Sequence, residues 1–209
     1  MTPAPVLILA STSRYRHELL SRLRLPFEVV ASEVDETPLH GETPAQLAQR
    51  LAMAKARAVS AKYPDAVVIG SDQVADLDGL SIGKPGSHER ATEQLRSMRG
   101  RSVVFQTAVA VVRAASGFSG TALVPVTVRF RRLNNEEIDR YLRAEEPYDC
   151  AGSAKCEGLG ITLLDSLDSN DPTALVGLPL IRTAALLRQA GIDSLGPALA
   201  QLSSDESDE

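Results

Sequence analysis

The sequence has no tryptophan, only two cysteines and three histidines, and aromatic residues make up 4% of its 209 positions. The core must therefore be aliphatic, and 44% hydrophobic residues are enough for one compact domain or two small lobes sharing a sheet. The spacing of Cys150 and Cys156 matches neither a CxxC pair nor a zinc ribbon, and no HExxH motif occurs. These absences argue against a zinc site and predict two free thiols.

The chain also lacks a basic field and a long apolar run. Its formal net charge is −5, so we expect no nucleic-acid partner. No segment has the length of a membrane span, and no basic region with a long apolar stretch opens the chain, so we expect a cytoplasmic protein without a membrane partner. The acidic end, SSDESDE, predicts a disordered tail over residues 197–209 that follows a single domain over residues 1–196.

The hydrophobic pattern predicts an α/β fold with a mixed central sheet flanked by helices, in two lobes around a cleft. The expected strands cover residues 6–10, 27–31, 66–70, 103–112, 122–130 and 160–164. The expected helices cover residues 14–23, 43–63, 87–100, 134–142 and 179–189. Helix caps are predicted at Thr43, Ser87 and Asn134 or Asn135, and the Asp78-Gly79 pair predicts a tight turn.

The first polar strand end is the stretch STSRYR, which separates the apolar run of residues 6–10 from a helix. The free N–H groups and the dipole of a helix N-terminus favour an anion, and small residues let a phosphate approach. Hydroxyls of Ser11 and Ser13 can donate to it, and Arg16 can add a bidentate contact. A simple N-cap with solvated arginines is the alternative for this stretch alone. Neither GxxxxGK[ST] nor GxGxxG is present.

The second polar strand end is GSDQ, directly after the apolar AVVIG. A carboxylate at the position of Asp72 can orient a water molecule or hold a metal, although an ordinary turn aspartate is the alternative. Lys84 lies between Gly83 and Pro85, which indicates a fixed backbone, whereas Lys55 on the long helix is favoured as a solvated lysine.

A third polar group is the acidic loop that contains Glu33, Asp35 and Glu36. Alone it is favoured as a solvated loop. Together with Asp72 it can supply oxygen ligands for Mg²⁺ or Mn²⁺. Cations and hydroxyls that suit a polyphosphate, beside carboxylates that suit a metal and a base, predict phosphoanhydride hydrolysis.

Seven motifs then occur in an order that resembles a known family: LASTSRYRHELL, SEVDET, LAMAKA, VIGSDQVADLDG, GKP, EEPYDCAGSAKCEGLGI and VGLPL. Across nearly the whole chain the sequence resembles the Maf family of nucleoside triphosphate pyrophosphatases, and within it the YceF-like branch associated with 7-methyl-GTP. The resemblance implies a fold like that of Maf and ITPase proteins, a divalent cation such as Mg, Mn or Co, a nucleotide substrate and often a homodimer. The products would be a nucleoside monophosphate and pyrophosphate.

The resemblance also implies a role for each matching residue. Asp72 falls on the proton-acceptor position. The positions that handle phosphate and metal are Ser11, Ser13, Arg16, Glu36, Lys55, Asp72 and Lys84. The positions taken to set base preference are Tyr15, Gln73 and Glu157.

Two residues depart from the family pattern, because Arg14 stands where proline is common and Tyr15 where the YceF-like branch has tryptophan. The expected substrate remains 7-methyl-GTP, since an aromatic ring and the Glu157 carboxylate suit a positively charged base. Two alternatives stay open: a dTTP/UTP pyrophosphatase of the same family, and a non-enzymatic regulator of septum formation and cell division.

Overall fold

The structure is a computed structural model, and it describes residues 5–196, so the predicted tail at 197–209 lies outside the described residues. The helices are α1 (Arg14–Ser21), α2 (Pro44–Ser60), α3 (His88–Met98), α4 (Asn135–Glu145) and α5 (Leu180–Gln189). The strands are β1 (Leu7–Leu9), β2 (Glu28–Val29), β3 (Val67–Leu77), β4 (Leu80–Ile82), β5 (Ser102–Arg113), β6 (Phe118–Phe130) and β7 (Leu164–Asp168).

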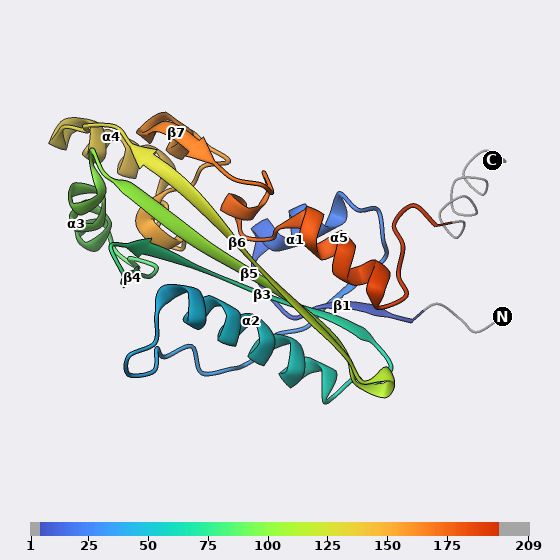
Figure 1. The fold of residues 1–209 in the computed structure, drawn as a ribbon. Coiled ribbons are helices and arrows are strands. Elements are labelled where there is room, and N and C mark those ends of the chain that lie inside the picture. Colours follow the sequence, from blue (N-terminus) through green and yellow to red (C-terminus); the bar gives the residue numbers. More distant parts are fainter. Residues whose placement is uncertain (1–4, 197–209) are drawn as a thin grey trace, which may run out of the picture.

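All the strands join one mixed sheet in the order β2-β1-β3-β5-β6-β7, with β4 added beside β3. Strand β1 runs parallel to β2 and β3, whereas the β3–β5, β5–β6 and β6–β7 pairs are antiparallel. Helix α2 lies along one face of the sheet, and α1 and α5 lie on the other (Figure 1). The predicted α/β class with a mixed central sheet is confirmed.

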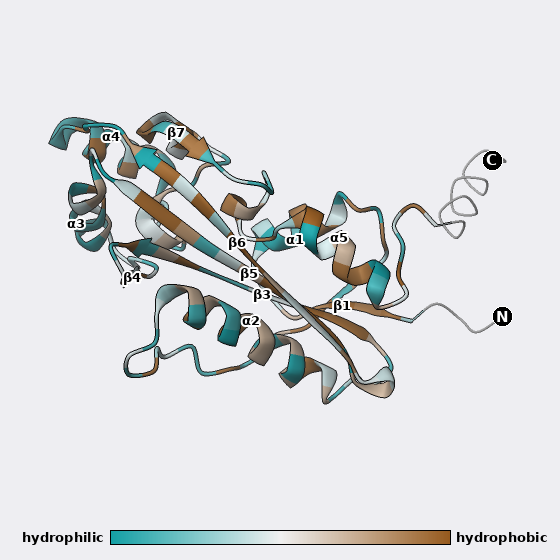
Figure 2. Ribbon diagram, viewed as in Figure 1, coloured by the Kyte–Doolittle hydropathy of each residue, from teal (hydrophilic) through white to brown (hydrophobic). Residues whose placement is uncertain are grey.

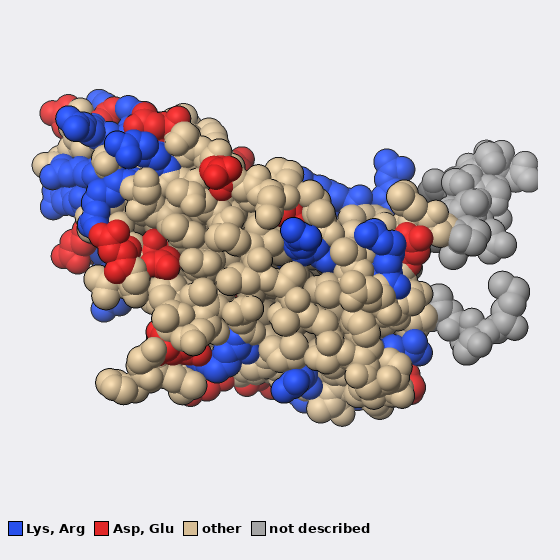
Figure 3. Space-filling model, viewed as in Figure 1, with Lys and Arg blue, Asp and Glu red and all other residues tan. Residues whose placement is uncertain are grey.

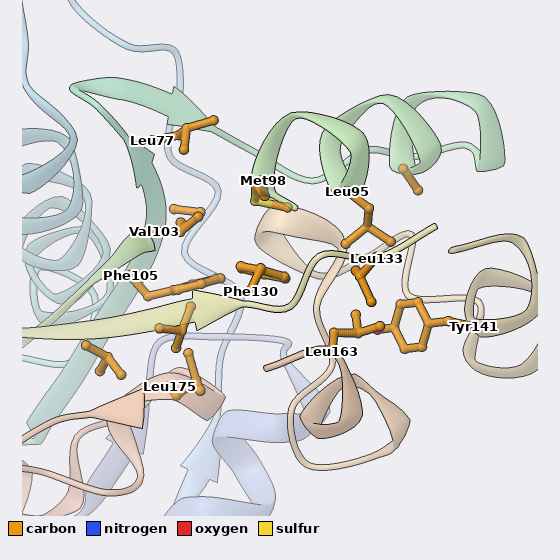
Figure 4. Close-up of a cluster of buried hydrophobic side chains, with 14 of the residues drawn as sticks. Leu77, Leu95, Met98, Val103, Phe105, Phe130, Leu133, Tyr141, Leu163 and Leu175 are labelled. Carbon is orange, nitrogen blue, oxygen red and sulfur yellow. The ribbon is translucent and has the colours of Figure 1, made fainter. Parts of the chain in front are cut away.

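The core divides into three apolar clusters. One lies between α2 and the sheet, and a second lies between the opposite face and helices α1 and α5. The third fills the far end of the sheet under α3 and α4, where Phe105, Phe130 and Leu133 pack together (Figure 4). Because β3, β5 and β6 are 11 to 13 residues long, they pass through both ends and join the two lobes. The apolar bands along these strands are visible in Figure 2.

Charged residues on the surface are also distributed unevenly between the two lobes. On the face shown in Figure 3, lysines, arginines and acidic residues gather around the end that holds α3 and α4, and the middle of the face is mainly uncharged. None of the helices in residues 5–196 is long and apolar enough to cross a membrane.

The local signals in the sequence located most element boundaries correctly. Thr43 and Asn134 form capping boxes, with Gln46 and Glu137 as their partners. Ser87 caps α3. The predicted strand at residues 160–164 is wrong, because residues Leu159–Leu163 form a 3₁₀ turn and the strand begins at Leu164. Leu163 in this stretch packs into the core under α3 and α4. The apolar pattern therefore comes from a buried turn and does not indicate a strand.

Strand β3 is longer than the sequence predicted, and this changes the position of Asp72. The apolar run ends at Gly70, yet β3 continues to Leu77 because β5 pairs with it as far as Asp76. On its other edge, β1 pairs with β3 only up to Ile69, and β4 begins to pair only at Ala75. Asp72 therefore lies within a strand, beside a gap in the sheet, and the prediction of a strand end at this point is wrong.

Gly70 allows α2 to approach β3 unusually closely. A Cβ atom at Gly70 would lie 2.2 Å from the carbonyl oxygen of Ala52 and 2.6 Å from the backbone nitrogen of Ala56. Both distances are far below van der Waals contact, and both atoms belong to the backbone of a helix. The absence of a side chain at this position thus sets the spacing between α2 and the strand that carries Asp72.

We expect Gly70→Ala to lower the free energy of unfolding by about 1–3 kcal/mol or more, because a methyl group here overpacks two rigid backbones. Urea denaturation followed by circular dichroism measures the change. Gly83→Ala is the matched control, since a Cβ atom at Gly83 meets nothing within 4 Å. Equal stability of the two variants would show that α2 does not depend on this close approach.

Candidate functional site

A cleft of about 890 Å³ opens beside the gap in the sheet. Its walls come from the N-terminus of α1, the acidic loop before α2, the middle of β3, the loop after β4 and the segments around residues 150 and 175. The structure brings all the predicted site residues to this cleft: Ser11, Ser13, Tyr15, Arg16, Glu36, Lys55, Asp72, Gln73, Lys84 and Glu157.

The alternation of side chains along β3 sends neighbouring residues to opposite faces of the sheet. Val68 and Val74 pack in the cluster under α2, so Asp72 between them points to the same helix. Ser71 and Gln73 point to the other face, where they bond to backbone oxygens of residues 174–177. One strand therefore supplies both walls of the cleft.

Lys55 links the two carboxylates of the site. Its Nζ lies 2.7 Å from Oδ1 of Asp72 and 2.6 Å from Oε1 of Glu36. The Lys55 and Asp72 side chains are only 7% and 10% exposed, whereas Glu36 is 56% exposed at the mouth of the cleft. Partial burial acts to raise the pKa of Glu36, but the Lys55 ammonium, with Lys84 and Arg16, holds that pKa below its ordinary value. The solvated lysine favoured at position 55 is thus wrong.

The two carboxylates fit a divalent cation. One oxygen of each lies within 2.7 Å of Lys55 Nζ, so the two carboxylates are close enough together for a cation beside the ammonium to take an oxygen ligand from each. Magnesium sites in phosphate-transfer enzymes often use only one or two carboxylates and complete their shell with water and substrate phosphate. No group of three or more potential ligands among His, Cys, Asp and Glu occurs within residues 5–196, so substrate oxygens would have to complete the shell.

Of the three acidic loop residues, only Glu36 contacts Lys55. Asp35 accepts a hydrogen bond from the backbone N–H of Thr37, and Glu33 lies 3.9 Å from Lys62. The three loop acids therefore do not come together as one group of metal ligands.

The N-terminus of α1 forms a compact polar corner. Ser13 is the N-cap and its hydroxyl accepts a hydrogen bond from the backbone N–H of Arg16. The hydroxyl of the buried Ser11 accepts from the Ser13 N–H at 3.2 Å and from Nη1 of Arg16 at 3.4 Å. Nε of Arg16 donates to the Gly177 carbonyl at 2.9 Å. Burial lowers the pKa of Arg16, and the nearby Asp72 and Glu36 carboxylates oppose this effect.

Lys84 completes the cationic side of the cleft. Its side chain is exposed, but the backbone on both sides is held. The Gly83 carbonyl accepts a hydrogen bond from Gln94, and the Gly86 N–H donates to the Tyr148 carbonyl. The fixed backbone that the GKP motif predicted is confirmed.

The guanidinium group of Arg14 lies over the aromatic ring of Tyr15. The guanidinium carbon of Arg14 lies 4.7 Å from the ring centroid, and Nη2 of Arg14 donates to the Tyr15 hydroxyl at 2.7 Å. Arg14 is also the first residue of α1, a position whose N–H has no partner within the helix. Proline fits such a position without losing a hydrogen bond, so the departure from proline at Arg14 leaves the helix start intact.

Gln73 and Glu157 present oxygen atoms to the cleft. The Gln73 amide nitrogen lies within 3.0 Å of Thr107 Oγ1 and of the carbonyls of Ala174 and Leu175. Backbone carbonyls only accept hydrogen bonds, so the amide oxygen must face away from them. Partial burial raises the pKa of Glu157, and the Glu145 and Asp149 carboxylates add to this effect against Lys155.

No local sequence pattern marks the residues that support this wall of the cleft. Asp171 is wholly buried, and its carboxylate accepts hydrogen bonds from backbone N–H groups at the start of α5. The neighbouring 3₁₀ turn, Ala174–Val176, supplies carbonyls to Gln73. A lone aspartate beside proline has the signature of a loop, and only the folded chain shows where its carboxylate points.

Fold and cleft together define an α/β protein with a polar helix N-terminus beside a lysine-bridged pair of carboxylates. A family model described as "Maf-like protein" matches residues 6–190. This match covers most of the chain, and the chain belongs to the Maf family.

Three relatives are similar over most of their own lengths, and each is named "7-methyl-GTP pyrophosphatase". The protein from Polaromonas sp. is 68% identical over 186 residues, which are 89% of this chain and 85% of the relative. The protein from Albidiferax ferrireducens is 66% identical, over 91% of this chain and 96% of its own. The protein from Burkholderia pseudomallei is 60% identical, over 92% and 91%. Among solved structures, a HAM1 protein from Coxiella burnetii has a TM-score of 0.45 at 18% identity, over 62% of this chain and 75% of its own.

The two cysteines near the cleft are free, as the sequence predicted, and burial raises the pKa of each thiol to about 12. At pH 8 only about one thiol in ten thousand would then be ionised, and the thiolate is the reactive form. We expect Cys150 and Cys156 to resist iodoacetamide at pH 8 in the folded protein and to react fully in urea. Mass spectrometry of the alkylated chain measures this. Rapid labelling of the folded chain would contradict the burial seen here.

Proposed function

We propose that this chain is a divalent-metal-dependent nucleoside triphosphate pyrophosphatase that acts on 7-methyl-GTP in the cytoplasm. The observation that carries the proposal is the lysine-bridged pair Asp72 and Glu36, which faces Arg16 and Ser11 across one cleft. In this proposal a general base and a cation site lie beside an anion site. Three relatives at 60–68% identity that share the name 7-methyl-GTP pyrophosphatase support the choice of substrate.

The reaction is a hydrolysis of the α–β phosphoanhydride. A water oxygen attacks the α-phosphorus, and the bond from that phosphorus to the bridging oxygen breaks. The products are 7-methyl-GMP and pyrophosphate, and Asp72 accepts the proton that the water loses. Only Oδ1 of Asp72 is bonded to Lys55, and Oδ2 makes no hydrogen bond within the described part of the chain. This second oxygen is the one open to water.

The cationic groups hold and neutralise the triphosphate. Nε of Arg16 is bonded to the Gly177 carbonyl and Nη1 to the Ser11 hydroxyl, which leaves Nη2 without a hydrogen-bond partner among residues 5–196 and available to the triphosphate. Lys84 approaches from the exposed rim, and Lys55 has three N–H donors, of which two meet carboxylates. Glu36 and Asp72 would hold the divalent cation, whose chemistry is to neutralise charge on the phosphate oxygens.

The proposed base site combines an aromatic face with hydrogen-bond acceptors. N7-methylation gives guanine a positive charge, and a cation on an aromatic ring contributes about 0.5–2 kcal/mol. The Glu157 carboxylate and the outward amide oxygen of Gln73 suit the N1–H and amino group of guanine. Uracil and thymine offer only one such donor and no positive charge, which favours the methylated purine.

The substrate assignment is tested by a panel of 7-methyl-GTP, GTP, dTTP and UTP with Mg²⁺, Mn²⁺ or Co²⁺. We expect the highest kcat/KM with 7-methyl-GTP, and pyrophosphate as the product in a coupled assay. Hydrolysis of dTTP and UTP alone would overturn the base assignment. Release of orthophosphate without pyrophosphate would overturn the proposed site of cleavage.

The role of Asp72 is tested by Asp72→Asn. Loss of a general base lowers rates by about 10²- to 10⁴-fold, so we expect a fall of that size in kcat. Asp76→Asn is the matched control, because Asp76 lies on the same strand and the same face, but within residues 5–196 its carboxylate is hydrogen-bonded only to Gly79 and Gln106. Steady-state kinetics on both variants decide the question, and full activity of Asp72→Asn would refute the mechanism.

The base site is tested by Tyr15→Leu and Glu157→Gln. Because the cation on the ring contributes about 0.5–2 kcal/mol, Tyr15→Leu is expected to lower the preference for 7-methyl-GTP over GTP by about 2- to 30-fold. Glu157→Gln removes a negative charge beside the cationic base and is expected to act in the same direction. Ratios of kcat/KM for the two nucleotides measure both effects. Unchanged ratios would place base recognition elsewhere.

A further inference from the structure

A segment opposite α2 holds several cleft residues in place without belonging to the anion site or the carboxylate pair. We call residues 171–180 the strap, because they cross from the end of β7 to the start of α5 along the wall of the cleft. Asp171 begins the strap, and its side chain is completely buried. It carries a carboxylate, a group that is costly to bury unless it is fully hydrogen-bonded.

The Asp171 carboxylate bonds both to the start of the strap and to the helix that follows it. Oδ2 accepts hydrogen bonds from the backbone N–H groups of Ile181 and Arg182, at 2.9 and 3.2 Å. Oδ1 accepts from the backbone N–H of Thr173 at 3.4 Å and lies 3.0 Å from the Thr173 hydroxyl. The carboxylate therefore closes the segment into a ring of hydrogen bonds.

The start of α5 explains why a carboxylate is needed there. The N-cap residue is Pro179, which makes no side-chain capping bond, so the first N–H groups of the helix need another acceptor. A negative charge at a helix N-terminus is also favoured by the helix dipole. Thr173 reinforces the closure, since its hydroxyl accepts from the Leu180 N–H and lies 2.8 Å from the Leu178 carbonyl.

The inner side of the strap presents three carbonyl groups to the cleft. The Gly177 oxygen accepts from Nε of Arg16 and from the Ser71 hydroxyl, both at 2.9 Å. The Ala174 and Leu175 oxygens each lie 3.0 Å from the Gln73 amide nitrogen. The strap thus fixes how the guanidinium is rotated and which end of the amide faces the cleft.

We infer that Asp171 is a positioning residue that sets, through the strap, both the anion grip of Arg16 and the base contact of Gln73. This inference rests on the proposed function, in which Arg16 meets the triphosphate and Gln73 faces the base. One buried carboxylate would then control substrate affinity and base preference together, although it touches neither phosphate nor base. A purely structural aspartate would affect stability alone.

The test begins with Asp171→Asn, which keeps the size of the side chain but places an NH₂ group against N–H donors. Hydrogen bonds to charged groups are strong enough that we expect a loss in kcat/KM of about tenfold or more, mainly through KM. We also expect a smaller preference for 7-methyl-GTP over UTP. Thr173→Val is a second, milder substitution in the strap. We expect it to change KM and the preference for 7-methyl-GTP over UTP in the same direction.

Thr183→Val is the matched control for damage to α5. The Thr183 hydroxyl is buried and donates to the Pro179 carbonyl at 2.8 Å, so its loss weakens the same helix end without touching the inner carbonyls of the strap. We expect a lower Tm with unchanged KM and unchanged preference. If Thr183→Val altered preference as much as Asp171→Asn at equal Tm, the effect would be one of stability, and the inference would fail.

A second measurement needs no substrate. In the unchanged protein the Arg16 Nε–H donates to Gly177, so its NMR signal should exchange slowly with solvent. We expect faster exchange in Asp171→Asn and Thr173→Val, and no change in Thr183→Val. If the unchanged protein failed to hydrolyse 7-methyl-GTP, the proposed function would fall, yet this comparison would still decide the role of Asp171. Unchanged exchange in both strap variants would overturn it.

Discussion

The site depends on a lysine that is buried between two carboxylates. An unpaired ammonium in the position of Lys55 would cost several kcal/mol, and removing one partner from a buried pair leaves an equally costly charge. Asp72 can thus be buried because Lys55 is there, and Lys55 can be buried because α2 lies so close to β3. That approach in turn requires Gly70, the only residue type without a Cβ atom. The close packing of α2 on β3, the glycine at position 70 and the buried charges of the site therefore depend on one another.

The sequence located elements well where the signal was local. The caps at Thr43, Ser87 and Asn134 depend on hydrogen bonds between residues three positions apart, and the structure has a cap at Thr43, at Ser87 and at Asn134, the first of the two asparagines predicted. The predicted end of β3 at Gly70 is wrong, because the polar residues 71–73 have the local pattern of a turn although they lie within the strand. Pairing with β5 along the whole stretch outweighs that local signal, and a sequence does not show which strand will lie alongside.

The site was only partly accessible from the sequence for a similar reason. Ser11 and Arg16 stand out because a helix N-terminus follows an apolar run, which is a short-range pattern. The solvated lysine expected at position 55 is wrong, although its spacing of four from Leu51 and eight from Leu47, both buried, already places it on the inner face of α2. Asp171 was invisible, because its four hydrogen bonds join residues that only the folded loop brings together.

The pleat of β3 allows the two faces of this strand to evolve separately. In the proposed function, Asp72 among the even-numbered residues of this strand would serve hydrolysis, and Ser71 and Gln73 among the odd-numbered residues would serve orientation of the substrate. The backbone between them is rigid and paired throughout with β5. A substitution on one face therefore need not move the other. Two requirements that often conflict in enzymes, a fixed reaction chemistry and an adjustable choice of base, are here separated by the thickness of a single strand.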